Sequence, residues 1–304
     1  MFKKLGWLIC IVVFCLIVQI SRNLPNGYLN ITFCDVGQGD AILLTYSFWQ
    51  MLIDTGPDDA VLACLEKKLP FWDKTIEVML ITHTDSDHVR GAASVLSNYR
   101  VNHLFLADVG GGDEYKNMLV ALNSANSSNT TLKKAILGQK ISFSPGGEVL
   151  ILAPSWSDLL TKIDNTQQFA ETLLSDVTQQ KPSHQLEPNE RSVVLYLRYQ
   201  WFELLLMGDL PKENELALME AGLITSVEGI KIGHHGSKTS TDPALIKKTQ
   251  PEFAVVSCGL KNKFGHPAPE TLETIQAHQV KIWRTDEVDT IELVTNGREY
   301  WFDQ

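Results

Sequence analysis

The chain has 304 residues with the apolar and charged fractions of an ordinary globular protein, which allows one large domain or two small ones. Its formal net charge of −10 excludes a global basic field that would attract nucleic acid, although a local basic patch is compatible with it. Cys34, Cys64 and Cys258 are scattered among apolar residues without metal-finger spacing, so we expect buried free thiols and no disulfide framework.

Residues 1–24 form the first segment. Lys3 and Lys4 precede an apolar stretch over residues 5–18, and residues 19–21 can extend it. We predict an uncleaved membrane anchor, since no convincing cleavage site follows; a secretory signal segment is the competing interpretation. The two lysines would stay in the cytoplasm, which puts the domain of residues 25–304 outside it. Cleavage of a signal would instead give a secreted protein.

The next elements begin as short strands and continue as alternating helices and strands. The pattern predicts strands at 28–33, 41–44 and 51–53, a helix at 58–69, a strand at 77–82, a helix at 87–99, a strand at 101–106, a helix at 113–122, and strands at 140–143 and 148–152. Residues 156–180 are the least informative and are predicted as helix and loop, followed by a solvent-exposed His184.

The second half repeats this alternation. It predicts strands at 192–198 and 201–207, a helix at 212–221, a strand at 229–232, a helix at 242–249, a strand at 253–257, a helix at 269–278, and strands at 280–283 and 290–294. This order indicates a layered α/β or α+β domain.

Four good metal ligands follow the predicted strand at 77–82 within six residues: His83, Asp85, Asp87 and His88. Imidazole and carboxylate groups are the ligands expected of zinc, manganese or iron sites. The alternative is a solvated polar loop with an Asp helix cap. The density of ligands between two apolar elements favours the metal site.

Further polar residues lie just past the ends of other predicted strands. They are Asp54, Asp209, His234 and His235. Asp54 either closes a turn or orients the metal loop. Groups at the ends of several strands meet at one edge of a sheet. The set could hold two ions bridged by a shared carboxylate, about 3.5–4 Å apart, with a hydroxide nucleophile for displacement at phosphorus.

In combination, the motifs resemble those of the metallo-β-lactamase superfamily and, more narrowly, the hydrolase domain of ComEC-type DNA-uptake (competence) proteins. The likeness covers residues 28–304. Its carriers are FCDVGQGDA (33–41), LIDTG (52–56), THTDSDH (82–88), MGDL (207–210), KIGHHGS (231–237), FGHP (264–267) and RTD (284–286).

The resemblance implies a four-layer αββα sandwich with one or two divalent ions, zinc or manganese, at one edge between the sheets. It assigns His83, Asp87, His88 and Asp209 as ligands, together with one of His234 and His235, of which we favour His235. Asp85 stands where the superfamily usually has His, which makes the site richer in oxygen and favours Mn²⁺ or Mg²⁺.

The resemblance also implies roles for single residues. Asp87 would bind metal and orient the attacking water, Asp209 would be the catalytic bridging carboxylate, and Asp54 would support the ligands. Ser237, Lys238, Thr239 and His266 are candidates for gripping a phosphate; otherwise, His266 is a turn residue before Pro267. The superfamily has a further His ahead of the bridging Asp. Asn189 or Ser192 occupies that stretch here, which puts the first metal site in doubt.

The resulting hypothesis is a phosphodiesterase or nuclease that acts on DNA outside the cytoplasmic membrane through a metal-bound hydroxide. Lysines 231, 238, 247, 248, 261 and 263 would form either a cationic strip beside the site or ordinary solvated surface. The alternatives are a small-molecule metallo-hydrolase for a phosphoester, lactone or β-lactam, and a non-catalytic ComEC-like protein. ComEC-type proteins usually carry many membrane helices, so a DNA-transport role does not carry over.

Overall fold

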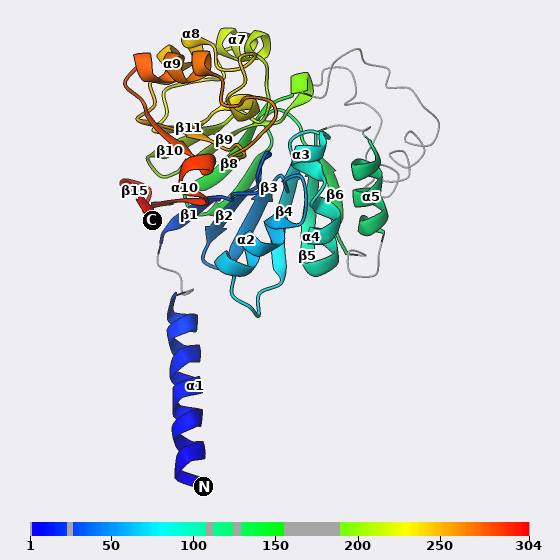
Figure 1. Ribbon diagram of the computed structural model, residues 1–304, viewed down its shortest axis with the longest axis vertical. Helices are drawn as coiled ribbons and strands as arrows, with labels where there is room; N and C mark the ends of the chain where they lie inside the picture. Colours follow the sequence, from blue (N-terminus) through cyan, green and yellow to red (C-terminus); the bar gives the residue numbers. More distant parts are fainter. Residues whose placement is uncertain (1, 23–26, 108–111, 124–128, 155–188, 304) are drawn as a thin grey trace.

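The computed structural model describes residues 2–22, 27–107, 112–123, 129–154 and 189–303 (Figure 1). The helix and loop predicted at 156–180, and His184, lie outside the described residues. Most predicted strands and helices of the remaining chain are found within a few residues of their expected bounds.

Two sheets form the centre of the domain. The first has the order β15-β14-β1-β2-β3-β4-β5-β6 and is parallel only from β3 to β6. Its strands are β1 (Leu29–Phe33), β2 (Ile42–Tyr46), β3 (Trp49–Ile53), β4 (Thr75–Ile81), β5 (Arg100–Leu106), β6 (Thr131–Lys134), β14 (Ile291–Thr295) and β15 (Tyr300–Asp303).

The second sheet has the order β13-β12-β11-β10-β9-β8-β7. Its strands are β7 (Lys140–Ser144), β8 (Gly147–Ala153), β9 (Val194–Tyr199), β10 (Phe202–Leu206), β11 (Gly229–Lys231), β12 (Phe253–Val256) and β13 (Lys281–Arg284). The strands β10 to β13 run parallel, with helices as crossovers.

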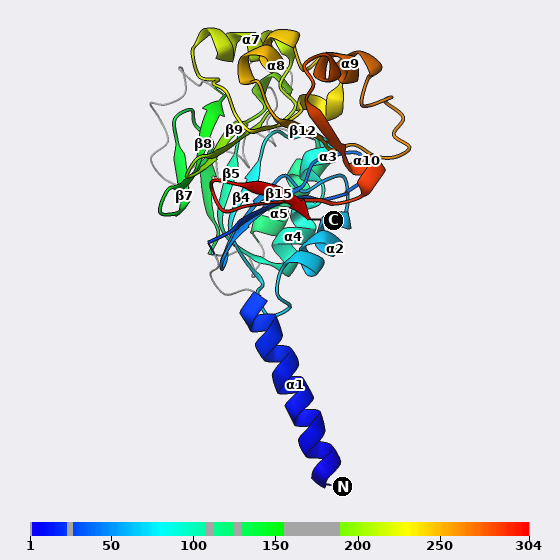
Figure 2. The same ribbon diagram turned by 90° about the vertical axis from the view of Figure 1, so that its left-hand side faces the viewer.

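Three buried apolar clusters show how the layers stack. The first joins the inner faces of the two sheets, for example Ile31 and Leu80 with Leu204. The second packs the first sheet against α2 (Ala60–Lys68), α4 (Ala92–Asn98) and α5 (Asp113–Leu122). The third packs the second sheet against α7 (Lys212–Glu220), α8 (Pro243–Thr249) and α9 (Pro269–Ala277). Helices therefore cover both outer faces (Figures 1 and 2), as the αββα expectation requires.

The helix predicted at 87–99 is wrong as one element. It forms two pieces, α3 (Ser86–Val89) and α4, separated at Arg90 and Gly91. A Cβ at Gly91 would lie 2.2 Å from the carbonyl oxygen of Thr55, so only glycine allows this close approach to the loop after β3. The prediction also missed β6, β15 and the short α10 (Thr285–Val288).

The expectation of free thiols is wrong for two of the three cysteines of the domain. Cys34, just after β1, forms a disulfide with Cys64 of α2, with their Cα atoms 6.0 Å apart. Cys258 is free and buried, as predicted. The bond ties the loop after β1 to the outer helix layer.

Replacing Cys34 by Ser should lower the free energy of unfolding by about 3–4 kcal/mol, because the bond closes a loop of 30 residues in the unfolded chain. Urea unfolding under non-reducing conditions measures this loss. Reductant should destabilise the wild type by a similar amount and leave the variant unchanged. The control is Cys10→Ser, at an exposed free cysteine. Equal stability of the oxidised and reduced wild type would contradict the prediction.

The N-terminal segment forms α1 (Phe2–Arg22). Within the described residues, none of the helices combines the length and the apolar character needed to cross a membrane. The membrane span predicted within residues 1–24 is therefore not shown.

Candidate metal centre

The ends of four strands place the candidate ligands at one edge of the two sheets. Asp54 follows β3, His83 follows β4, Asp209 follows β10, and the η3 turn (Gly233–Gly236) after β11 carries His234 and His235. Asp54, His234 and His235 have φ of 59°, 49° and 53°, in the left-handed region that non-glycine residues seldom adopt. Such strained backbone is characteristic of positions where side-chain direction matters more than local stability.

The imidazole rings of His88 and His235 and the Asp209 carboxylate converge on one point, and Asp87 adjoins it at His235. The Nε2 atoms of His88 and His235 face each other at 3.3 Å. Asp209 Oδ2 lies 3.4 Å from His88 Nε2 and 3.5 Å from His235 Nε2, and Asp87 Oδ2 lies 3.2 Å from His235 Nε2. His88, His235 and Asp209 are almost fully buried, whereas the Asp87 side chain is 28% exposed. The group is thus open to solvent on the Asp87 side.

The other ring nitrogen of each histidine has its own acceptor. His88 Nδ1 lies 2.8 Å from Asp54 Oδ2, and His235 Nδ1 lies 2.9 Å from the carbonyl oxygen of Ser257. Because these acceptors require protons on both Nδ1 atoms, the Nε2 atoms of the neutral rings present lone pairs to each other. Two lone pairs at 3.3 Å repel unless a proton or a metal ion lies between them. The residues therefore fit a divalent cation.

The pKa shifts of His88, His235 and Asp209 show that this group of side chains favours a positive charge at its centre. Burial lowers the pKa of His88, but the carboxylates of Asp209 and Asp54 more than offset this and hold it well above the usual value. Burial also opposes charge on His235, yet Asp209 and Asp40 raise its pKa. Burial would raise the pKa of Asp209, but His235 and His88 hold it well below the usual value. The carboxylate of Asp209 is ready to bind a cation.

A second group of ligands shares Asp209 with the first. His83 Nε2 lies 3.8 Å from Asp209 Oδ2 and 3.8 Å from Asp85 Oδ2. It is buried and has no hydrogen-bond partner among the described residues. His234 Nε2 lies 3.9 Å from Asp209 Oδ2. In the part of the chain that the structure describes, Asp209 Oδ1 also lacks a hydrogen-bond partner. The arrangement can hold one ion in the tight group and a second beside it, with Asp209 shared.

Asp54 lies behind this site and contacts His88 and Thr82. Its carboxylate accepts hydrogen bonds from the backbone N–H and the hydroxyl of Thr82, both at 2.7 Å, besides its contact with His88. Burial raises the pKa of Asp54, against the opposing effect of His88. Since Thr82 Oγ1 also lies 3.1 Å from His83 Nδ1, one carboxylate orients the rings of both histidines.

Two supporting residues were missed by the sequence reasoning. Lys231 of β11 is completely buried and forms an ion pair with Asp40, which is 1% exposed. Asp40 is close enough to His88, Asp209 and His235 to join a metal site with them. However, its carboxylate approaches the Nδ1 atoms of the two histidines, at 3.6 and 4.0 Å. We therefore assign Asp40 to orienting the rings and neutralising Lys231.

The phosphate-gripping candidates lie beside the late histidines. Thr239 Oγ1 is 3.4 Å from His234 Nδ1 and 3.0 Å from Ser237 Oγ. Ser237 is buried, whereas Lys238 and Thr239 are exposed. The geometry makes Thr239 a support for the His234 ring and leaves Lys238 accessible to a ligand.

His266 also joins the site. Its ring lies 5.5 Å from that of His234 and 6.4 Å from that of His235. Its Nδ1 is buried, with no hydrogen-bond partner in the described ranges. Asn189 Nδ2 lies 3.5 Å from His234 Nε2, while Ser192 Oγ accepts a hydrogen bond from the Asp209 backbone N–H. Asn189 thus lies beside the second group of ligands, and Ser192 positions the backbone of Asp209.

A buried acid outside the site holds the segment that carries Thr239. Glu215 of α7 is fully buried and accepts hydrogen bonds from the backbone N–H groups of Thr241 and Asp242, both at 2.8 Å. The Lys212 N–H donates to the Thr239 carbonyl oxygen at 3.0 Å. Burial raises the pKa of Glu215 to about 7, against the effect of the two N–H groups.

This raised pKa predicts a pH dependence of stability. Glu215 binds its proton more tightly in the folded than in the unfolded chain, where its ordinary pKa is 4.5. Its contribution is therefore complete below about pH 4.5 and is lost as the pH rises through about 7, a change of about 3 kcal/mol. Urea unfolding at pH 5 and pH 8 measures it. Relative to Glu215→Gln, the wild type should lose stability as the pH rises. A difference that does not vary with pH would contradict this.

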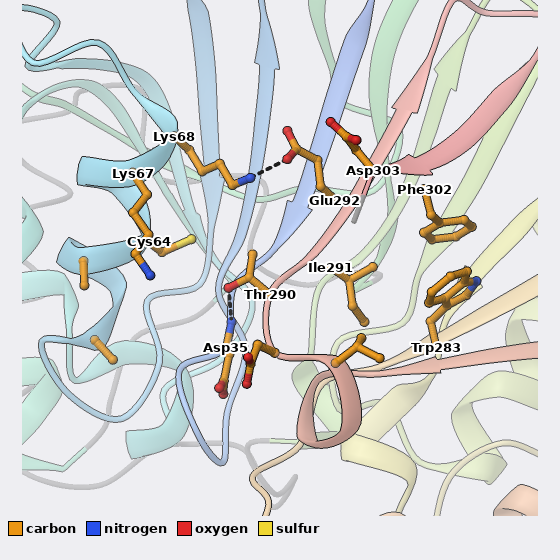
Figure 3. A pocket seen from close by; sticks show the side chains of 14 residues that line it. Asp35, Cys64, Lys67, Lys68, Trp283, Thr290, Ile291, Glu292, Phe302 and Asp303 are labelled. Carbon is orange, nitrogen blue, oxygen red and sulfur yellow. Dashed lines mark hydrogen bonds and ion pairs between the residues drawn. The ribbon is translucent and has the colours of Figure 1, made fainter.

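A separate cavity of about 740 Å³ lies between α2 and the strands β13, β14 and β15 (Figure 3). Trp283 and Phe302 stack at 4.2 Å on one side of it, and Lys68 and Glu292 form an ion pair on the other. Its lining residues include Asp35 and Cys64 but none of the candidate ligands. The cavity is thus distinct from the metal centre.

Comparison with known proteins confirms the resemblance inferred from the motifs. The chain is 26% identical over 311 residues to ComE operon protein 3 of Bacillus subtilis, covering 96% of this chain and 36% of that protein. It is 25% identical over 281 residues to Recombination protein 2 of Haemophilus influenzae, covering 90% and 30%. A shorter match, 33% identical over 102 residues, is to Competence protein ComA of Neisseria gonorrhoeae. The chain thus spans about a third of the length of the first two proteins.

Solved structures agree on the fold. The metallo-β-lactamase fold protein YhfI from Bacillus subtilis matches with a TM-score of 0.52 at 10% identity, covering 90% of this chain and all of that one. Tm1679, a metal-dependent hydrolase of the β-lactamase superfamily, matches with a TM-score of 0.52 at 15% identity, covering 84% and 95%. No protein-family model matches the sequence. The chain therefore has the metallo-β-lactamase fold.

Proposed function

We propose that this chain is a metal-dependent phosphodiesterase that cleaves single-stranded DNA. The observation that carries the proposal is the convergence of two buried imidazole Nε2 atoms and the Asp209 carboxylate on one point. The similarity to a competence protein and a recombination protein supports DNA as the substrate class.

A divalent ion at this point, zinc or manganese, would supply a Lewis acid that polarises a phosphoryl oxygen and activates water at neutral pH. His88, His235, Asp209 and Asp87 would hold it. Asp54 accepts the proton of His88 Nδ1, so that Nε2 is the metal-binding nitrogen of the neutral ring. Asp87, partly exposed at the rim, is placed to orient an incoming water. His83, Asp85 and His234 would hold a second ion.

The lysines bear on the choice of substrate. Lys231 is buried, so it is not part of a cationic strip. Lys247 and Lys248 lie in the last turn of α8, which leads away from the site to β12. Lys238, Lys261 and Lys263 are exposed. Lys238 follows the turn that carries His234. Lys261 and Lys263 flank Asn262, whose side chain hydrogen-bonds to both the backbone N–H and the carbonyl oxygen of His266. Three of the six lysines therefore support a local cationic surface.

An exposed aromatic ring at the same place favours nucleic acid over a small phosphoester. Phe264 is 58% exposed, and its ring stacks on His266 at 5.8 Å. Lys263 Nζ lies 5.3 Å from the Phe264 ring centroid. A ring flanked by a cation is the usual platform on which a nucleic-acid base stacks.

The test compares the hydrolysis of single-stranded DNA with that of bis(p-nitrophenyl) phosphate by protein loaded with Mn²⁺ or Zn²⁺. Phe264→Ala should lower kcat/KM for DNA about 5- to 100-fold, the loss expected for one base stack, and leave the small diester unchanged. The matched control is Phe71→Ala, at an exposed aromatic ring remote from the site. Hydrolysis of only the small diester, or of a lactone or β-lactam, would instead favour a small-molecule hydrolase. Metal binding without turnover would favour a non-catalytic protein.

The proposed place of action is outside the cytoplasm. The Cys34–Cys64 disulfide supports it, because such bonds persist in oxidising compartments. Anchoring through residues 1–24, or secretion after cleavage there, stays a prediction. Fractionation of cells into cytoplasmic, membrane and external fractions tests it.

A further inference from the structure

Exposed aromatic side chains gather at the edge of the domain opposite the metal centre. In the part of the chain that the structure describes, seven aromatic side chains outside α1 are exposed, and one of them, Phe264, lies beside the site. The other six, here called the aromatic edge, are Tyr28, Phe48, Phe71, Trp72, Trp201 and Trp301, exposed by 37 to 73%.

Strand direction places all six at the same edge. β3, β4 and β10 run toward the metal centre, so the turns that precede them lie at the far end. These turns carry Phe48, Phe71 with Trp72, and Trp201. The Trp201 N–H donates to the carbonyl oxygen of Gly297 in the β14–β15 turn, which joins the far ends of the two sheets.

Tyr28 and Trp301 complete the aromatic edge from the neighbouring strands. Tyr28 precedes β1, whose first residue pairs with the end of β2, and Trp301 lies near the start of β15. Their rings meet edge to face at 5.4 Å. Side chains from several separate turns thus form one apolar rim.

The chain connects the helix α1 to the domain at this rim. The chain between Arg22 and Tyr28 can reach at most about 20 Å, so the end of α1 lies near the aromatic edge. Figures 1 and 2 show α1 leaving the domain on the side away from α7, α8 and α9. It exposes large apolar side chains, among them Trp7, Ile9 and Phe14. The rim and the helix would find an apolar environment on the same side.

Exposed charges of both signs lie at the rim. Lys74, Arg100 and Arg298 are exposed at this end of the strands together with Glu252 and Glu299, and Asp73 is partly exposed. Asp73 is engaged by the Gln50 amide. An edge of Trp, Tyr and Phe with interspersed charged groups matches the headgroup region of a bilayer, where amphipathic rings accumulate.

We propose that the aromatic edge is a membrane-contacting surface that seats the domain on a lipid bilayer. The contact is made by the domain itself and adds to whatever α1 contributes. Because the seven residues of β4 separate the rim from His83, the metal centre would face away from the bilayer, about 20 Å above its surface. This orientation leaves the metal centre open to substrate from the solvent side.

The test uses the full chain with phosphatidylcholine vesicles that contain anionic phosphatidylglycerol and acyl chains brominated to quench tryptophan. The background variant Trp7→Phe removes the α1 fluorophore and keeps an aromatic ring. We expect brominated lipid to quench this variant. Most of the quenching should be lost when Trp72, Trp201 and Trp301 are also changed to Phe. The control adds Trp283→Phe to the Trp7→Phe background in place of the three substitutions. Trp283 lines the cavity of Figure 3, so this change should leave the quenching unchanged.

A second measurement does not depend on the variants. Hydrogen exchange of the backbone at 69–75 and 199–202 should slow when the wild type binds vesicles, while exchange at 259–266 should not change. Three results would each overturn the proposal. They are a failure of the protein to bind vesicles, a lack of quenching in the Trp7→Phe background, and quenching that persists after the three further substitutions. Unquenched tryptophans on bound protein would point to a protein partner for this rim.

Discussion

Replacing Asp209 by Asn should remove bound divalent metal and, with it, phosphodiester cleavage. Within the described residues, Asp209 is the one carboxylate that approaches all of His83, His88, His234 and His235, so its loss affects both candidate ion positions. An amide retains the shape but neither the charge nor the second acceptor oxygen. We expect metal affinity and kcat/KM each to fall by at least about 100-fold, since even a supporting group costs 10- to 100-fold in affinity.

The matched control for Asp209→Asn is Asp113→Asn, at an exposed acid in the first turn of α5. It should retain the metal content and activity of the wild type. Metal content by mass spectrometry and a thermal melt of each variant separate loss of the ion from loss of folding. An Asp209→Asn protein that is folded, keeps its metal and remains active would contradict the assignment of the site.

Replacing Lys231 by Met should destabilise the protein by about 3–5 kcal/mol, because it leaves the buried Asp40 carboxylate without its cation. Urea unfolding gives this difference directly. Most of this loss of stability should come from the unpaired Asp40 charge and little from altered packing, since Met has a shape similar to that of Lys but carries no charge.

A double variant isolates the ion pair. Asp40→Asn with Lys231→Met removes both charges and should recover at least half of the lost stability. If the single and double variants are equally unstable, the damage lies in packing and the buried pair has no such role. The same variants report on the site, because Asp40 also lies 3.6 Å from His235 Nδ1.

The sequence was most informative where a short motif follows a strand. His83, Asp85, Asp87 and His88 lie within six residues after β4, so local geometry alone brings them together. Asp209 and the pair His234 and His235 could be added because parallel strands end at a common edge. The alternation of apolar strands and amphipathic helices likewise predicted the layers, although bounds shifted by a few residues.

The features that were missed depend on contacts between distant parts of the chain. A cysteine pair 30 residues apart cannot be assigned from spacing, because the pairing depends on how α2 packs beside the end of β1. Lys231 did leave a signal. It lies between Ile230 and Ile232 in an apolar strand, and a buried lysine requires an acidic partner. Its partner Asp40 is 191 residues away, so the sequence could not identify it.

The most direct test is to locate the ion. Crystals of the protein grown with Mn²⁺ and measured for anomalous scattering should show a peak between the rings of His88 and His235. The peak should lie about 2.0–2.3 Å from both Nε2 atoms and from Asp209 Oδ2. A second peak beside His83 would indicate two ions. A map with no peak at this point, while the crystal contains Mn²⁺ elsewhere, would contradict the metal centre and the proposed activity.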